Sequence, residues 1–309
     1  MKLSIIAPCY NEEINIRLFY DEVLKNIEKI KDIEKYEIIY IDDGSNDNTL
    51  IEIKKIAEKN KSVKYISFSR NFGKESAIFA GLEYSKGDYI VLMDVDLQHP
   101  PELMELMVKK ISEDNYDSVA AIRKDRNKEN FIRAFFSKSF YLVLNKISNI
   151  EIKKNSTDYR MMTKQFKESV LSLGEYNRFT KGIFNWVGYE TYNIEYENIS
   201  RKKGESKWSF MDLFKYSIEG IISFSVFPLL ISSILGIISF TISIIMLVVF
   251  FFKSIIFGEV IRGFPTIICS IFFIGGIQLL SIGILGQYLA KTYLEVKNRP
   301  QYIIKDKSE

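Results

Sequence analysis

Cysteine and histidine are scarce in this chain. Its 309 residues include two cysteines, Cys9 and Cys269, and one histidine, His99. Two cysteines so far apart provide neither a disulfide framework nor the ligand spacing of a zinc site. A single histidine excludes a histidine-based metal cluster, and we interpret His99 as a local loop residue rather than a catalyst.

A strong charge of one sign and a glycine-rich phosphate loop are also missing. Lysine and arginine number 42 against 39 aspartates and glutamates, a net charge of +3 that is too small to indicate a nucleic-acid-binding protein. No G-x-G-x-x-G follows the first expected strand and no P-loop is present, which excludes those two nucleotide sites. The apolar start Leu3–Ala7 is too short for a signal peptide and runs into Pro8, so we expect none.

Charge almost disappears from one long region. Between Phe224 and Ala290 the only charged residues are Lys253, Glu259 and Arg262. They divide the region into two apolar stretches, each longer than the roughly 20 residues that cross a bilayer. We predict two transmembrane helices, at about 226–252 and 264–290; one long buried hairpin is the alternative.

Basic residues gather at the open ends of this expected hairpin. They are Arg201, Lys202, Lys203, Lys207 and Lys215 before it, and Lys291, Lys297, Arg299, Lys305 and Lys307 after it. The turn between the two helices carries only Lys253 and Arg262. By the positive-inside rule we predict that both termini face the cytoplasm.

Strand-like and helix-like segments alternate before the apolar region. The expected strands are Lys2–Ala7, Ile38–Ile41, Val63–Phe68, Tyr89–Met93 and Ser118–Ile122. The expected helices are Ile14–Lys29, Thr49–Lys59, Glu75–Tyr84 and Glu102–Ser112. Such alternation predicts an α/β domain with a parallel sheet and helices on both faces.

Two carboxylates and a carboxamide follow the fourth expected strand. They are Asp94, Asp96 and Gln98. Aspartates at i and i+2 leave a strand on the same face about 7 Å apart, and Mg²⁺ takes one or two carboxylates beside water and substrate phosphate. The pattern favours a metal site that holds a diphosphate; two solvated aspartates at a strand end are the alternative.

Two more acidic loops end strands that we expect at the same edge. One carries Tyr10 and Glu12, and the other carries Asp42 and Asp43. Open α/β sheets bind ligands at the carboxyl ends of their strands, and Asp43 could accept from a base N–H or a ribose hydroxyl. Each loop alone could be an ordinary polar loop that ends a strand, but three such loops at one edge favour a nucleotide site.

The motifs P-x-Y-N-E, D-D-G-S, R-N-F-G-K and D-V-D-L-Q-H-P-P-E, in this order, resemble family 2 glycosyltransferases. The nearest branch holds dolichol-phosphate mannose synthase and the bacterial polyprenyl-phosphate glycosyltransferases. The resemblance implies a Rossmann-like GT-A fold, a nucleotide-sugar donor, and Mg²⁺ or Mn²⁺ on Asp94, Asp96 and Gln98. The implied donor-binding residues are Pro8, Tyr10, Glu12, Asp42, Asp43, Lys74, Asp94, Arg201, Ser206 and Lys207.

The resemblance also assigns residues nearer the acceptor. Asp158, in the segment S-x-D-x-R, is the candidate base, and Asp96 is the second residue that we name as catalytic. Arg160 and Arg178 are expected to contact the acceptor or a phosphate, although Asp158 and Arg160 could also form a simple structural ion pair. The later R-x-x-G-x-S-K segment resembles the loop that covers the donor diphosphate; a basic cluster that binds lipid headgroups is the alternative.

The organisation expected from these signals has four parts. They are a cytoplasmic glycosyltransferase domain (1–205), an amphipathic juxtamembrane helix (206–223), the two membrane helices (224–292) and a cytoplasmic tail (293–309). The predicted activity is transfer of a hexose, glucose from UDP-glucose, to undecaprenyl phosphate at the bacterial plasma membrane, by a homo-oligomer. Alternatives are another sugar or lipid acceptor, or a non-catalytic membrane protein that binds nucleotide sugars. A processive polysaccharide synthase is disfavoured because no Q-x-x-R-W motif is present.

Overall fold

The computed structural model describes most of the chain. The described residues are 1–124, 156–197, 222, 225–257 and 263–308. Three of the predicted donor-binding residues, Arg201, Ser206 and Lys207, lie outside them, as does nearly all of the expected amphipathic helix at 206–223.

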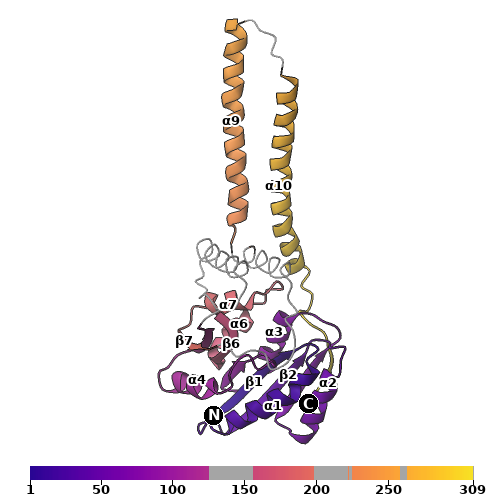
Figure 1. Cartoon of the computed structure of the whole chain (residues 1–309), viewed down its shortest axis with the longest axis vertical. Coiled ribbons are helices and arrows are strands. Elements are labelled where there is room, and N and C mark those ends of the chain that lie inside the picture. Colours follow the sequence, from indigo (N-terminus) through magenta and orange to yellow (C-terminus); the bar gives the residue numbers. More distant parts are fainter. Residues whose placement is uncertain (125–155, 198–221, 223–224, 258–262, 309) are drawn as a thin grey trace.

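A mixed eight-stranded sheet forms the centre of the first domain (Figure 1). Its strands are β1 (Lys2–Cys9), β2 (Lys35–Asp42), β3 (Val63–Phe68), β4 (Tyr89–Leu92), β5 (Ser118–Arg123), β6 (Ser156–Thr163), β7 (Thr191–Tyr196) and β8 (Ile304–Lys307). They lie in the order β7-β5-β6-β4-β1-β2-β3-β8. The run from β4 to β3 is parallel, whereas β6 and β8 pair antiparallel with their neighbours.

Helices cover both faces of this sheet. The helices of the domain are α1 (Glu13–Ile27), α2 (Thr49–Lys59), α3 (Lys74–Tyr84), α4 (Leu103–Ser112), α6 (Lys164–Ser172) and α7 (Thr180–Trp186). Buried side chains of α1, α2 and α4 form one core, and those of α3, α6 and α7 form the other. Helix α3 packs so closely on β1 that a Cβ at Gly81 would lie 2.1 Å from Ile6 Cγ2.

The prediction of an α/β domain is confirmed, with one correction. The expected bounds of β3 and α2 agree with the structure, and the other predicted elements differ by a few residues at their ends. The expectation of a parallel sheet holds for the pairs among β1 to β4 and for β5 with β7, but β6 inserts antiparallel between β4 and β5 and β8 pairs antiparallel with β3. Strands β6, β7 and β8 were not expected.

Two long apolar helices extend from the domain side by side (Figure 1). They are α9 (Phe227–Phe257) and α10 (Phe264–Val296). Each contains a stretch long and apolar enough to cross a membrane, Phe227–Met246 and Ser270–Val296. Neither stretch is buried inside the protein, so the buried-hairpin alternative is excluded for these described residues.

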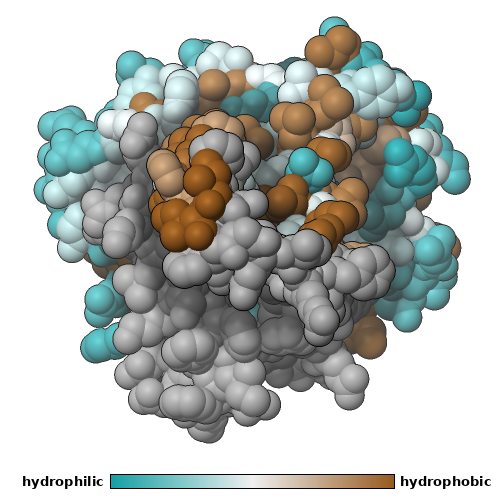
Figure 2. All heavy atoms as spheres, turned by 90° about the horizontal axis from the view of Figure 1, so that it is seen from above, coloured by the Kyte–Doolittle hydropathy of each residue, from teal (hydrophilic) through white to brown (hydrophobic). Residues whose placement is uncertain are grey.

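The view along these helices shows the same contrast in surface character. In Figure 2 brown hydrophobic atoms gather near the centre, whereas teal hydrophilic atoms occupy much of the rim. The exposed apolar side chains of α9 and α10 include Phe240, Ile255, Phe272 and Leu279, each at least 65% exposed. A lipid bilayer is the solvent that suits such surfaces.

The segment after α10 returns to the α/β domain. Strand β8 pairs with β3 at the edge of the sheet, and the Tyr302 ring stacks on Phe68 with centroids 4.8 Å apart. The Glu295 carboxylate, at the end of α10, accepts from the backbone N–H groups of Tyr176 at 2.9 Å and Asn177 at 3.1 Å. The described part of the segment that we expected as a tail (293–309) is therefore attached to the domain through Glu295, Tyr302 and β8.

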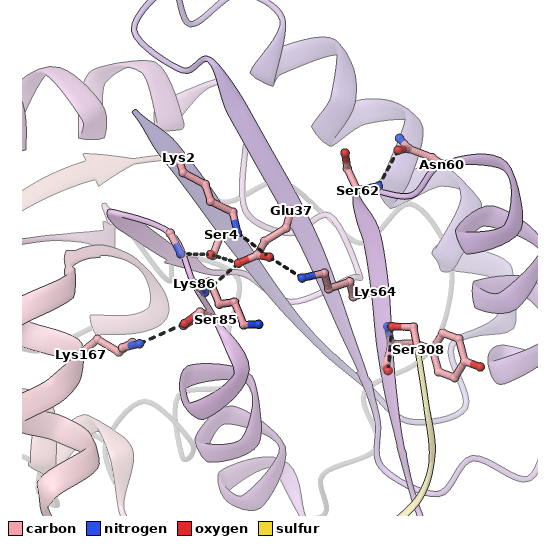
Figure 3. Close-up of polar contacts among 12 residues, drawn as sticks. Lys2, Ser4, Glu37, Asn60, Ser62, Lys64, Ser85, Lys86, Lys167 and Ser308 are labelled. Carbon is pink, nitrogen blue, oxygen red and sulfur yellow. Dashed lines mark hydrogen bonds and ion pairs between the residues drawn. The ribbon is translucent and has the colours of Figure 1, made fainter.

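Lysines surround a buried carboxylate near the amino ends of the parallel strands (Figure 3). Glu37, which is 2% exposed, accepts from Ser4 Oγ at 2.6 Å and from Lys64 Nζ at 2.9 Å. Lys2 Nζ lies 2.9 Å away, and the Lys86 backbone N–H donates at 2.7 Å. Burial raises the pKa of Glu37, but these four donors outweigh it and lower the pKa to about 2. We call this group the Glu37 cluster.

Candidate active site

The parallel strands bring three polar loops to the carboxyl edge of the sheet. Cys9, at the end of β1, lies in register with Asp42, at the end of β2. On the other side of β1, Met93 follows β4 and donates its backbone N–H to Ile6 O at 3.0 Å. The loops that follow β1, β2 and β4 therefore start at one edge, as predicted.

Hydrogen bonds from backbone N–H groups to side-chain oxygens fasten the first two loops to each other. Asn11 has a positive φ of 52°; its N–H donates to Ser45 Oγ at 2.9 Å, and its side-chain oxygen accepts from Asn46 N at 2.8 Å. Glu12 N donates to Thr49 Oγ1 at 2.8 Å. Asparagine tolerates the left-handed conformation better than most residues, which accounts for its place in this turn.

The predicted nucleoside-pocket residues Pro8, Tyr10 and Glu12 lie along the same loop. Pro8 is buried in β1, whereas Tyr10 and Glu12 are half-buried. The Glu12 carboxylate accepts from Asn15 Nδ2 at 2.6 Å and so supports the first turn of α1. Their contact with a nucleoside stays a prediction.

Asp42 and Asp43 support loops in this structure. Asp42 accepts from Ser67 Oγ at 2.7 Å and from Ser45 N at 3.1 Å. Asp43 accepts from the backbone N–H groups of Phe72 at 2.7 Å and Gly73 at 2.9 Å. Both aspartates are less than 5% exposed. The structure thus gives Asp43 a role that we did not predict: it fixes the R-N-F-G-K loop.

Burial and hydrogen bonding act in opposite directions on the Asp43 carboxyl group. Burial raises its pKa to about 6, although the N–H donors of Phe72 and Gly73 favour the ionised form.

Gly44 is tightly placed beside the same loop, with φ at +68°, and an added Cβ would lie 2.4 Å from the Arg70 carbonyl carbon. Glycine is required here for both conformation and space.

A lysine joins two aspartates at the centre of this edge. Lys74 is the first residue of α3 and follows Gly73, whose φ of 97° suits glycine. Lys74 Nζ lies 2.8 Å from Asp94 Oδ1 and 2.7 Å from Asp158 Oδ2. These three residues form what we call the Lys74 cluster, and sequence analysis named each of them without predicting their contact.

The Lys74 cluster is strongly stabilised in its charged form. Burial raises the pKa of Asp94 and of Asp158, but the Lys74 ammonium group outweighs burial and leaves both pKa values lowered. Burial lowers the pKa of Lys74, but the negative charges of Asp158 and Asp94 outweigh burial and raise this pKa overall. All three groups are therefore ionised at neutral pH.

The loop after Asp94 carries the other predicted metal ligands. Asp96 Oδ1 accepts from Gln98 N at 3.1 Å, across Leu97 with its positive φ of 55°. Gln98 Oε1 accepts from Arg123 Nη2 at 3.1 Å, so its oxygen is directed toward an arginine that sequence reasoning missed. A carbonyl oxygen has a second lone pair, and metal ligation by Gln98 stays a prediction.

His99 is buried beneath this loop. Its Nδ1 lies 2.7 Å from the Tyr196 hydroxyl, and its Nε2 lies 3.8 Å from Asp94 Oδ2. Arg123 Nε also donates to the Tyr196 hydroxyl, at 3.3 Å. His99 is a loop residue, as predicted, but it also helps to place Asp94. Tyr196 belongs to β7, a strand that the sequence did not reveal.

The two arginines predicted near the acceptor lie in different surroundings. Arg160 is 4% exposed on β6, with its guanidinium carbon 4.0 Å from the Phe184 ring centroid, and burial lowers its pKa to about 10. Arg178 donates to the carbonyl oxygens of Val170, at 3.2 Å, and Leu173, which end α6. In this structure Arg178 supports a helix end rather than the Lys74 cluster. Phosphate contact by either arginine stays a prediction.

The donor set at the edge fits a hard divalent cation. Among the described residues no group of three or more histidine, cysteine, aspartate or glutamate side chains is placed to hold a metal ion. Asp94 and Asp96 supply two carboxylates, which suffice for Mg²⁺ or Mn²⁺ when a diphosphate and water complete the shell. The Lys74 ammonium group already shows that Asp94 takes a cation.

Comparisons with known proteins identify the family of the chain. The model of the family "Glycosyl transferase family 2" matches residues 4–171. A Bacillus subtilis (strain 168) protein named as the glycosyltransferase CsbB is 42% identical over 98% of this chain and 91% of its own length. The "Prophage bactoprenol glucosyl transferase homolog" of Escherichia coli (strain K12) is 41% identical over 99% of both chains. The "Bactoprenol glucosyl transferase" of Shigella phage SfV is 39% identical over 100% of both.

A solved structure is more distant. Glucosyl-3-phosphoglycerate synthase from Mycobacterium tuberculosis, in complex with Mn²⁺, UDP-glucose and phosphoglyceric acid, is 17% identical, with a TM-score of 0.48. The likeness covers 72% of this chain and 77% of that one. A likeness at this level carries no argument about ligands.

The family model covers more than half of the chain, and the curated relatives match it over nearly its whole length. The chain therefore belongs to glycosyl transferase family 2 and is a glycosyltransferase with a GT-A domain followed by two apolar helices.

Proposed function

We propose that this protein transfers glucose from UDP-glucose to undecaprenyl phosphate at the cytoplasmic face of the bacterial plasma membrane. The observation that carries the proposal is the full-length similarity to proteins named bactoprenol glucosyl transferase, at about 40% identity. This similarity includes the two apolar helices, which suit an enzyme whose acceptor is a lipid. The biased distribution of basic residues supports a topology with both termini in the cytoplasm.

The proposed reaction is a single displacement with inversion. An oxygen of the acceptor phosphate attacks the anomeric carbon, the bond from that carbon to the UDP β-phosphate oxygen breaks, and UDP leaves with the electron pair. Mg²⁺ or Mn²⁺ on Asp94 and Asp96, with Gln98 as a third ligand, would offset charge on the leaving diphosphate. Lys74 would do the same, a role supported by the contact of its ammonium group with Asp94.

The other predicted donor contacts complete the proposal. Pro8, Tyr10 and Glu12 would line the nucleoside pocket, and Asp43 would shape it through its hold on Phe72 and Gly73. Arg201, Ser206 and Lys207 would close over the diphosphate. Arg160 and Arg178 would act near the acceptor. Arg160 would do so through the electric field of its own buried positive charge, which interacts with Asp158.

Asp158 is proposed to position groups rather than to remove a proton. A phosphate monoester has a second pKa near 6, so the acceptor is largely a dianion at neutral pH and needs no base. The Asp158 carboxylate is already hydrogen-bonded to Lys74 at 2.7 Å. It would therefore hold that ammonium group and help to shape the acceptor side of the site.

The test uses the full chain in detergent, undecaprenyl phosphate and a panel of radiolabelled nucleotide sugars. Label from UDP-glucose alone should enter the organic phase, and EDTA should abolish the transfer. Transfer from another donor would keep the reaction and change the sugar. If no donor is used although nucleotide binding is measurable, the acceptor is a different lipid or the protein is a nucleotide-sugar sensor.

A further inference from the structure

The Lys74 ammonium group occupies a cation position at the D-x-D motif. It contacts both oxygens of Asp94, at 2.8 and 2.9 Å, and one oxygen of Asp158, at 2.7 Å. Asp94 therefore has both of its oxygens engaged by one lysine. A metal at Asp94 would need at least one of the same two oxygens.

The position of Lys74 is built into the fold. Its backbone follows Gly73, whose N–H is held by Asp43, and it begins the rigid helix α3. Its side chain remains 40% exposed, against 26% for Asp94 and 18% for Asp158. The backbone of Lys74 is thus fixed while its side chain is partly exposed, so the ammonium group can turn to a ligand without disturbing the core.

A divalent cation and Lys74 are rivals for Asp94. The Lys74 ammonium group and a divalent cation, held on one carboxylate about 3–4 Å apart, repel each other by several kcal/mol at the effective dielectric constant of a protein surface. A donor diphosphate removes the conflict, since it adds negative charge that both cations can share. The same two cations that exclude each other in the free protein can then bind together.

We propose that Lys74 is the resident counter-cation of Asp94 and makes divalent metal binding depend on the nucleotide diphosphate. This inference rests on the proposed function, since it assigns how that donor and its metal enter the site. The free enzyme would hold little metal. Donor binding would draw the Lys74 ammonium group toward the diphosphate and leave Asp94 to the metal.

The experiment measures Mn²⁺ binding to the full chain in detergent, from the electron paramagnetic resonance signal of free Mn²⁺. Wild type is titrated with and without UDP, beside Lys74→Met and Lys86→Met. Lys86 is the matched control, because it is an exposed lysine just beyond the other end of α3, roughly 18 Å away by helix rise. We expect UDP to tighten Mn²⁺ binding to wild type at least tenfold. Without UDP, Lys74→Met should bind Mn²⁺ at least tenfold more tightly than wild type, and Lys86→Met should match wild type.

Each outcome separates this inference from the function on which it rests. If Lys74→Met binds Mn²⁺ no more tightly than wild type without UDP, while wild type binds it tightly with UDP, the inference is overturned and the metal site stands. If wild type with UDP binds no Mn²⁺, the proposed metal site itself fails. Lys74→Arg keeps the charge and should bind as weakly as wild type without UDP; a tenfold gain in this variant would also overturn the inference, whether or not the methionine variant folds.

Discussion

The two edges of the parallel sheet carry similar groups in different states of exposure. At the amino edge, the carboxylate of the Glu37 cluster is 2% exposed and has four donors within 2.9 Å. At the carboxyl edge, the carboxylates of the Lys74 cluster share one ammonium group and are 26% and 18% exposed. A saturated, closed group can contribute only stability. An open group with shared donors can exchange one partner for a ligand.

The largest expected effect comes from the open edge. Asp94→Asn should lower kcat/KM for transfer by about a hundredfold to a thousandfold, the range found when one preorganised electrostatic contact to developing charge is lost. The thermal unfolding midpoint should change by a few degrees at most, since Asp94 is partly exposed. Label transfer and a melting curve on the same preparation check both expectations. Unchanged transfer in a folded variant would remove Asp94 from the metal site.

The closed edge should show the reverse pattern. The pKa of Glu37 falls from 4.5 to about 2 on folding, which corresponds to about 3 kcal/mol of stability at neutral pH. Glu37→Gln should therefore lower the unfolding free energy by about 2–3 kcal/mol and leave kcat/KM of the folded fraction unchanged.

The pH dependence gives this prediction a sign. Because the folded pKa is the lower one, the contribution of Glu37 is complete above pH 4.5 and is lost as the pH falls toward 2. The difference in stability between wild type and Glu37→Gln should shrink over that window in denaturation series at several pH values. A difference that stays constant would mean that packing, and not charge, is responsible.

Asp158→Asn tests a partner within the Lys74 cluster. With acceptor bound at saturation, we expect kcat to fall about tenfold or less, because the acceptor phosphate is already largely a dianion and needs no base. Single-turnover measurements with pre-bound lipid give this number. A loss of several orders of magnitude with unchanged lipid binding would instead establish general base catalysis.

Asp43 offers a smaller, pH-dependent effect. Its pKa of about 6 means that acidification protonates it and removes an acceptor from the N–H groups of Phe72 and Gly73. Wild type should bind UDP several-fold more tightly than Asp43→Asn at pH 7.5, and the ratio of the two affinities should approach one at pH 5. Since UDP itself titrates equally in both experiments, the ratio isolates Asp43; a ratio independent of pH contradicts the assignment.

The smallest effect is expected at the edge strand β8. Lys54 pairs with Asp306 at 2.5 Å, but the two side chains are 40% and 38% exposed, and such surface pairs contribute little. Lys54→Ala should cost less than about 0.5 kcal/mol in unfolding free energy. A cost near that of Glu37→Gln would show that the attachment of the chain end to the sheet is a main source of stability.

Local patterns in the sequence were sufficient for β1 to β4 and their helices. Val63–Phe68 and Thr49–Lys59 could be bounded because apolar runs and helical spacing are local signals. Strand β6, with the sequence Ser156–Thr163, has no clear alternation and is placed by pairing with β4 and β5. Strand β8 has three charged side chains in four residues and depends on contact with β3, more than 230 positions away.

The candidate site divides in the same way. Asp94 and Asp158 could be named from motifs, but their link through Lys74 spans 84 residues and depends on the antiparallel β6. Arg123 and Tyr196, which hold Gln98 and His99, carry no motif and were missed. The loop-fixing role of Asp43 is equally invisible in the sequence, because its partners are backbone N–H groups.

The most direct test of the difference between the two edges is a calorimetric titration of UDP into the full chain in detergent, with Mn²⁺ or with EDTA. Wild type, Glu37→Gln and Asp94→Asn are compared. Our account predicts that wild type and Glu37→Gln bind UDP with equal affinity in Mn²⁺ and much more weakly in EDTA, whereas Asp94→Asn binds weakly in both. Equal binding of UDP to wild type in Mn²⁺ and EDTA, or a loss in Glu37→Gln as large as in Asp94→Asn, would contradict it.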